Sequence, residues 1–139
     1  MAKPKPVIDH LSAPFWEGCK DDRLRLQTCT QCATPRFPPG PQCLQCGCES
    51  SNWIDASGRA RVYSWIVVRH PVPAPIYAHD VPYVVALVEL AEGVRMPTNI
   101  VDCAPEAVAA DMELEVCFRD RADGLRLPLF RPLSSPGPR

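Results

Sequence analysis

Four cysteines near the start of this 139-residue chain constrain its fold more than any other feature. Cys29 and Cys32 form one C-x-x-C pair, Cys43 and Cys46 form a second, and ten residues stand between the pairs. Each such turn can direct two thiolates at the same point, so the four sulfurs can surround one tetrahedral ion. The spacing predicts a zinc ribbon that holds one structural Zn²⁺ per chain.

Disulfides and a redox centre are the alternatives to a metal site. The stretch "MAKPKPVIDHLSAPF" is broken by prolines and does not resemble a secretory signal, so we expect a cytoplasmic protein. In a reducing compartment, the eight cysteines favour metal binding over disulfides. A thioredoxin-like centre would require a strand and a helix around one pair, and the sequence predicts no such unit.

The remaining cysteines raise the question of which sulfurs are ligands. Cys48 could replace Cys46, but Gly47 suits the positive φ that a cysteine turn needs after its second ligand, which favours Cys46. Cys19, Cys103 and Cys117 have no partner at ligand spacing, and we expect them to be small buried residues. A closed set of four cysteines has no open position for water, so the predicted metal is not catalytic.

The rest of the chain predicts a mostly β protein with a short helix before the ribbon. Ser12 can cap that helix, and Phe15, Trp16 and Cys19 can share its apolar side. The two aromatic residues either pack within the protein or anchor a partner. Period-two segments then predict a five-stranded OB-fold barrel with strands at 60–70, 82–90, 94–102, 112–120 and 125–132.

We expect four segments along the chain: an arm and helix (1–23), the zinc ribbon (24–52), the OB-fold domain (53–133) and a flexible tail (134–139). In the first strand, alternation places Val62, Ser64, Ile66 and Val68 on one face and Tyr63, Trp65 and Val67 on the other. Pro97 within the third strand predicts an edge or a bulge. A short helical segment is expected at 105–110, between the third and fourth strands.

Charge and hydropathy disfavour two classes of partner. The chain has 15 Lys and Arg against 16 Asp and Glu, so it lacks the basic excess that drives nucleic-acid binding. An outward pair of aromatics, Tyr63 and Trp65, beside Arg59, Arg61 and Arg69 is the one arrangement that could bind single-stranded nucleic acid. No segment approaches the roughly 20 apolar residues of a membrane helix.

Catalysis by the chain alone is a further alternative. His70, His79 and Asp80 flank the segment "PVPAPIYA", and a loop of this kind is a place where binding residues often lie. Two histidines and an aspartate do not form a catalytic set without a nucleophile within reach. We therefore expect no catalytic residues in this chain.

The order of several dissimilar motifs resembles the DUF35 family. "PFWEG" is followed by C-x-x-C with "RFPP", then C-x-x-C-G, "GRARVYSW", "VPYVVALVELAEGVRMPTNI" and "LPLFRP", which together span 14–132. The resemblance implies a non-catalytic subunit that supports a thiolase-fold acyl-CoA enzyme, such as a thiolase, an acyltransferase or a steroid side-chain aldolase. It also implies, as an alternative, a partner of the MaoC-type enoyl-CoA hydratases. In either complex the partner would supply the catalytic residues.

The resemblance leads to three expectations about this chain's surface. Arg59, Arg61 and Arg69 could receive the phosphates of CoA. The helix at 12–20 and the ribbon would form much of the contact with a thiolase-fold dimer, and the loop 69–83 would lie toward the CoA entrance. One departure from the family pattern is Ala33, which stands where a glycine often follows the first cysteine turn.

Overall fold

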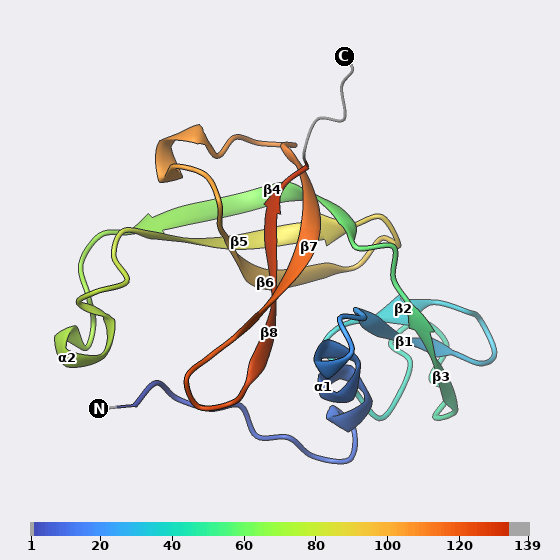
Figure 1. Ribbon diagram of the computed structural model, residues 1–139. Helices are drawn as coiled ribbons and strands as arrows, with labels where there is room; N and C mark the ends of the chain where they lie inside the picture. The colour runs from blue at the N-terminus through green and yellow to red at the C-terminus, as the bar shows by residue number, and fades with distance from the viewer. Residues whose placement is uncertain (1, 134–139) are drawn as a thin grey trace.

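The computed structural model describes residues 2–133, and it has two parts (Figure 1). A small three-stranded sheet with a helix beside it precedes a closed barrel of five strands. This confirms the predicted fold class: a mostly β chain with a short helix, a four-cysteine ribbon and an OB-fold barrel. The expected tail at 134–139 lies outside the described residues.

Helix α1 (Ala13–Lys20) has Pro14 in its first turn, as expected, but its start differs from the prediction. Ser12 makes no side-chain cap because its own backbone is helical, with φ −94° and ψ −11°. Instead the Asp9 carboxylate accepts the N–H groups of Leu11 and Ser12 at 3.1 and 2.9 Å. The helix therefore begins at the predicted position, but the side chain that supports the turn before it is Asp9 and not Ser12.

The ribbon sheet has the strand order β2-β1-β3, with β1 at Arg25–Cys29, β2 at Pro35–Arg36 and β3 at Ser51–Asp55. Its last strand pairs with β1 as far as Asp55, which lies opposite Arg25. The expected boundary between ribbon and barrel, after residue 52, therefore falls inside β3. Backbone pairing carries the ribbon three residues further along the chain.

The barrel strands follow the order β4-β5-β6-β8-β7 and close through pairing of β7 with β4. Their bounds are β4 Arg59–Val68, β5 Tyr83–Leu90, β6 Arg95–Ile100, β7 Glu113–Asp120 and β8 Arg126–Pro132. Helix α2 (Ala74–Tyr77) lies in the connection between β4 and β5, and a single 3-10 turn (Pro105–Ala107) stands where a helical segment was expected.

A bulge in β4 makes the predicted face assignment wrong for the second half of that strand. The register against β5 shifts between Val62 and Ser64, so one residue of β4 has no partner of its own. Val62 points inward and is buried, whereas Trp65 and Val67 take the inward positions after the shift. Ile66 is left outward, with 62% of its surface exposed.

Pro97 lies opposite Leu87 of β5, in a part of β6 that is unpaired on its other side. The only paired position that β6 and β8 share in the described residues is Ile100 with Phe130. This edge-like position agrees with the prediction, because proline has no N–H to donate to a neighbouring strand.

One hydrophobic core joins the two parts. Phe15 from α1 and Leu26 from β1 are buried in the same cluster as Val88 and Phe130 of the barrel. The Phe15 ring also lies 5.5 Å from that of Phe37, in the segment after β2. Across residues 2–133 the structure has no helix long and apolar enough to cross a membrane.

Candidate metal centre and neighbouring surfaces

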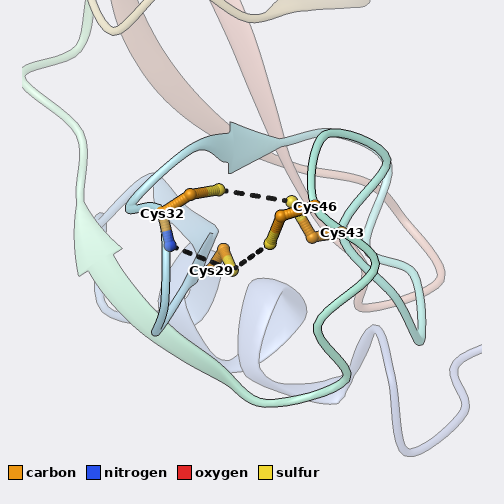
Figure 2. A group of neighbouring side chains, drawn as sticks. All are labelled: Cys29, Cys32, Cys43 and Cys46. Atoms are coloured by element: carbon orange, nitrogen blue, oxygen red, sulfur yellow. Dashed lines mark hydrogen bonds between the residues drawn. The ribbon is translucent and has the colours of Figure 1, made fainter.

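The structure brings the four predicted cysteines together at one end of the ribbon (Figure 2). Their sulfurs all lie within 4.8 Å of one another, with Cys29 3.5 Å from Cys46 and Cys32 3.6 Å from Cys43. Zn–S bonds of about 2.3 Å at tetrahedral angles place sulfurs about 3.8 Å apart. The cluster therefore fits a tetrahedral ion of this kind without rearrangement of the chain.

Backbone N–H groups support the sulfurs within each turn. Those of Gln31 and Cys32 point at the Cys29 sulfur at 3.3 and 3.4 Å, and that of Gln45 points at Cys43 at 3.4 Å. Such bonds stabilise thiolates, which are the form that binds a metal. Cys29 and Cys43 are buried, whereas the second cysteine of each turn is exposed.

Hydrogen bonds shift the pKa values of two thiols in this cluster in opposite directions. The Thr34 hydroxyl, 3.1 Å from the Cys32 sulfur, lowers the pKa of Cys32 to about 6. A backbone hydrogen bond from Cys48 lowers the pKa of Cys46, but hydrogen bonds with neighbouring thiols outweigh it and raise that pKa to about 12. The sulfurs are thus close enough to compete for protons.

Cys48 lies outside the cluster. Its sulfur accepts the N–H of Ser50 at 3.4 Å and lies 3.8 Å from the Thr30 hydroxyl. Cys19 is fully buried, and burial raises the pKa of its thiol to about 12. Cys103 and Cys117 are half-buried, and burial also raises the pKa of each. None of these three thiols is poised to act as a nucleophile.

The three arginines predicted to contact CoA do not form a cluster. Arg59 begins β4 and Arg69 follows its end, so ten residues of strand place them about 30 Å apart. Arg61 donates to Glu89 at 2.7 Å, and Arg69 donates to Glu106 at 3.1 Å. Their contact with CoA phosphates stays a prediction, but Arg59 and Arg69 are too far apart to bind one phosphate together.

The pair of outward aromatics that could stack nucleic-acid bases is also absent from the barrel. Trp65 packs against the core as a result of the β4 bulge. Tyr63 remains half exposed, and the Arg95 guanidinium lies 3.8 Å from the centre of its ring. The tyrosine face is therefore already covered by a cation from β6.

The histidines considered for catalysis are on the surface. His70 and His79 are both exposed, on either side of α2. Asp80 is exposed too, and it forms an ion pair with Lys3 at 2.7 Å. Lys3 belongs to the N-terminal arm, which runs beneath the barrel toward α1 (Figure 1).

A hollow of about 420 Å³ on the barrel was not foreseen from the sequence. Tyr77 lines it from α2 and Tyr83 from the start of β5. Lys3 lines it from the arm, and Arg119 and Arg121 line it from the end of β7 and just beyond. These residues are far apart in the chain, so no local motif marks them. Tyr77 and Asp80 of the loop 69–83 line the hollow, and the position of this loop toward a CoA entrance stays a prediction.

Comparison with known proteins identifies both parts of the chain. The model of the ChsH2 rubredoxin-like zinc ribbon domain matches residues 16–50, and that of the ChsH2 C-terminal OB-fold domain matches residues 53–119. A solved chain of an "Ltp2-ChsH2(DUF35) aldolase" is 42% identical with a TM-score of 0.83, covering 92% of this chain and 98% of that one. A DUF35 protein from Sulfolobus solfataricus shares the fold alone, at 13% identity and a TM-score of 0.65, covering 89% of this chain and 86% of that one.

Some curated relatives are much longer than this chain, and others are of similar length. A probable enoyl-CoA hydratase alpha subunit of Thermomonospora curvata is 43% identical over 94% of this chain, which spans only 40% of that protein. The 3-oxo-4,17-pregnadiene-20-carboxyl-CoA hydratase alpha subunit of Mycobacterium tuberculosis is 36% identical over 88% of this chain and 38% of the relative. A DUF35 domain-containing scaffold protein of Methanocaldococcus jannaschii is 39% identical over 80% of this chain and 79% of its own length.

The chain therefore spans about two fifths of the two hydratase subunits, but most of the scaffold protein. The two family models match the ribbon and then the barrel along this chain. This chain belongs to the DUF35 family, in which a rubredoxin-like zinc ribbon precedes an OB-fold.

Proposed function

We propose that this chain is a non-catalytic accessory subunit of a thiolase-fold acyl-CoA enzyme that forms or cleaves C–C bonds, such as an aldolase of steroid side chains. The observation that carries this proposal is the 42% identity and near full-length overlap with a chain of the Ltp2–ChsH2(DUF35) aldolase. The partner subunit supplies the catalytic residues. This chain supplies a folded surface that supports the partner.

In this function the metal has a structural role. Cys29, Cys32, Cys43 and Cys46 would hold one zinc ion, and the closed set of sulfurs leaves no position for substrate or water. Zinc would stabilise the ribbon, because metal binding in such small modules is coupled to folding. The core shared by α1, the ribbon and the barrel then holds the ribbon in a fixed position on the barrel.

Acyl-CoA would lie at or near the interface between the subunits. The hollow beside Tyr77 and Tyr83 supports this placement, because its aromatic side chains suit an adenine ring. Its cations Lys3, Arg119 and Arg121 are each ion-paired with an aspartate, so phosphates would have to replace these partners. Arg59 and Arg61 line one hollow of about 640 Å³ and remain candidates for a shared phosphate contact, whereas Arg69 could make only a separate one.

A second candidate is a subunit of a MaoC-type enoyl-CoA hydratase. The 43% identity with the Thermomonospora hydratase subunit over 94% of this chain favours it. The match leaves out the remaining three fifths of that relative, so the catalytic part of such a hydratase would lie outside residues 1–139.

Co-expression distinguishes the two candidates. The chain is produced with the Ltp2-type protein of its own genome and, separately, with the MaoC-type protein, each pair being purified through a tag on this chain and analysed by size exclusion. Stable co-elution with the Ltp2-type protein is expected. Co-elution with the MaoC-type protein alone would favour the second candidate, and failure with both would reject the proposal.

A further inference from the structure

The hydrogen-bond pattern of the ribbon sheet shows which backbone groups of its outer strands are free. β1 bonds to β2 through its odd-numbered residues, since the Cys29 N–H donates to the Thr34 carbonyl. It bonds to β3 through its even-numbered residues, since the Thr30 N–H donates to the Ser50 carbonyl. Bonded and non-bonded positions alternate along an antiparallel pair of strands. The odd-numbered residues of β3 therefore direct their backbone groups away from β1.

Three residues of β3 present free backbone groups at the edge of the sheet. Ser51, Trp53 and Asp55 lie at the non-bonded positions, so their N–H and C=O groups face outward. β3 is the outer strand of the ribbon sheet (Figure 1), and no backbone hydrogen bond from another part of residues 2–133 reaches these groups. The strand thus presents a regular row of free donors and acceptors.

The two edges of the sheet differ in their protection against further pairing. β2 is only two residues long, and Pro35 turns its ring nitrogen, which carries no hydrogen, toward the outside. The β3 sequence "SNWID" contains no proline or lysine, and the strand pairs with β1 at five successive positions without a bulge. Its one charged residue, Asp55, is neutralised by Arg23 at 2.6 Å. An edge of this kind is typical of a strand that pairs with another chain.

Side chains at the two ends of β3 are complementary to each other. The Ser51 hydroxyl accepts from the Gln27 amide at 3.0 Å, and its own proton has no acceptor within residues 2–133. The Asp55 carboxylate accepts from Arg23 on Oδ2 only, at 2.9 and 2.6 Å. Its Oδ1 is 3.7 Å from the Arg25 Nε, which is too far for a hydrogen bond. One end of the strand therefore has a free hydroxyl proton, and the other has a free carboxylate oxygen.

An antiparallel second copy of β3, centred on Trp53, satisfies all of these groups together. Trp53 then lies opposite the copy's own Trp53, and Ser51 lies opposite Asp55 at both ends. Each outward-facing residue exchanges both of its backbone hydrogen bonds with the copy. The serine hydroxyl can donate to the free Oδ1, and no like charges face each other. Sliding the copy by two residues would leave one of the three outward-facing residues without a partner.

We propose that the outer edge of β3 pairs with the same edge of a second copy of this chain. Two three-stranded ribbon sheets then form one continuous sheet around a two-fold axis. The association is weak and depends on protein concentration, because each backbone hydrogen bond replaces a bond to water. This self-pairing goes beyond the proposed function and does not depend on it, since it involves no other protein.

Sedimentation velocity on the zinc-loaded protein tests the association. We expect a monomer at about 10 µM and a dimer at about 1 mM. Ser51→Pro removes an N–H that faces outward, so it should leave the pairing with β1 intact and abolish the dimer. Ser51→Glu places a carboxylate opposite the copy's Asp55 and should raise the dimer Kd about tenfold or more. Ser51→Ala is the matched control, because it keeps the N–H and should raise the Kd only about threefold.

Amide hydrogen exchange, followed by NMR, tests the position of the surface. The Trp53 N–H should exchange about tenfold more slowly at about 1 mM protein than at about 10 µM, because pairing with the copy protects it. The Ile54 N–H is the internal control, since it already bonds to β1 and should not change with concentration.

Zinc content and melting temperature show whether each variant is folded, and Ser51→Glu decides the outcome if Ser51→Pro does not fold. A monomer at every concentration would overturn the proposal, as would a dimer that Ser51→Glu leaves unchanged. Protection of the Trp53 N–H only after a thiolase-fold enzyme is added would assign the edge to that enzyme and reject self-pairing.

Discussion

Ala33 and Gly47 occupy the same place in the two cysteine turns, directly after the second cysteine. Both have positive φ, 64° for Ala33 and 81° for Gly47. The N–H of Ala33 donates to the Cys29 carbonyl at 3.0 Å, and that of Gly47 donates to the Cys43 carbonyl at 2.9 Å. The missing glycine therefore leaves the turn geometry intact, at a conformational cost of about 1 kcal/mol for alanine.

This relationship predicts opposite effects for two exchanges. Ala33→Gly should raise the free energy of unfolding of the zinc-loaded protein by about 0.5 kcal/mol, because glycine relieves the strain but adds freedom to the unfolded chain. Gly47→Ala should lower it by about 1 kcal/mol. A Cβ at Gly47 would be 3.7 Å from the nearest side-chain atom, so a clash does not confuse the comparison. Chemical denaturation measures both, and a loss of stability in Ala33→Gly would contradict the equivalence of the turns.

The cysteine cluster predicts which substitutions abolish metal binding. Cys29→Ser and Cys43→Ser should lose zinc and unfold the ribbon, because the ion and the turns are coupled. Cys48→Ser should keep one zinc per chain, since its sulfur lies outside the cluster. Elemental analysis of the purified variants measures the zinc content per chain. Full zinc in a Cys46→Ser protein, with loss in Cys48→Ser, would reverse the ligand assignment.

Much of this site could be predicted because its signal is local. The ligand spacing fixes which sulfurs can meet, and Gly47 identifies Cys46 over Cys48. The alternation of apolar residues likewise predicts the number and order of the barrel strands. The β4 bulge could not be predicted, since nothing in "RVYSWI" marks the one residue that leaves the pairing. Trp65 consequently lies on the inward face of β4, so Tyr63 and Trp65 do not form the predicted outward aromatic pair.

Contacts between distant segments could not be predicted from the sequence, for a different reason. Arg59 and Arg69 look like neighbours in a basic stretch, but an extended strand separates them by its full length. Arg36 has no feature in the sequence that predicts its burial. In the structure it is 9% exposed, and its Nη2 donates to the Gly40 carbonyl at 3.0 Å.

Trp16 provides a test of whether α1 anchors a partner. Its ring packs edge-on against Phe15 at 5.1 Å and contacts the core, although it remains partly exposed. We expect Trp16→Ala to lower the free energy of unfolding by about 3 kcal/mol, because it removes a large side chain from a packed site. Partner affinity of the folded variant should change little. Thermal denaturation measures the stability of this variant, and calorimetry measures its affinity for the partner. A weakened complex with unchanged stability would make Trp16 an interface anchor.

The buried thiol of Cys19 predicts a loss of stability in alkali. Its pKa is about 12 in the folded protein and 9.0 in the unfolded chain, so the unfolded form ionises first as pH rises. The stabilising contribution is complete below pH 9 and is lost progressively between pH 9 and 12. Denaturation at pH 8 and pH 10.5 should show a steeper fall for the wild type than for Cys19→Ala. Equal slopes would contradict the pKa assigned to this thiol.

Reconstituted activity tests the central claim, that this chain supports an acyl-CoA enzyme without catalysing the reaction. Retro-aldol cleavage of a β-hydroxyacyl-CoA is measured for the purified chain alone, for the Ltp2-type protein alone and for their complex. The account predicts no turnover by the chain alone and a rate for the complex at least about tenfold above that of the Ltp2-type protein. Cleavage by the chain alone, or a partner that is fully active without it, would contradict the account.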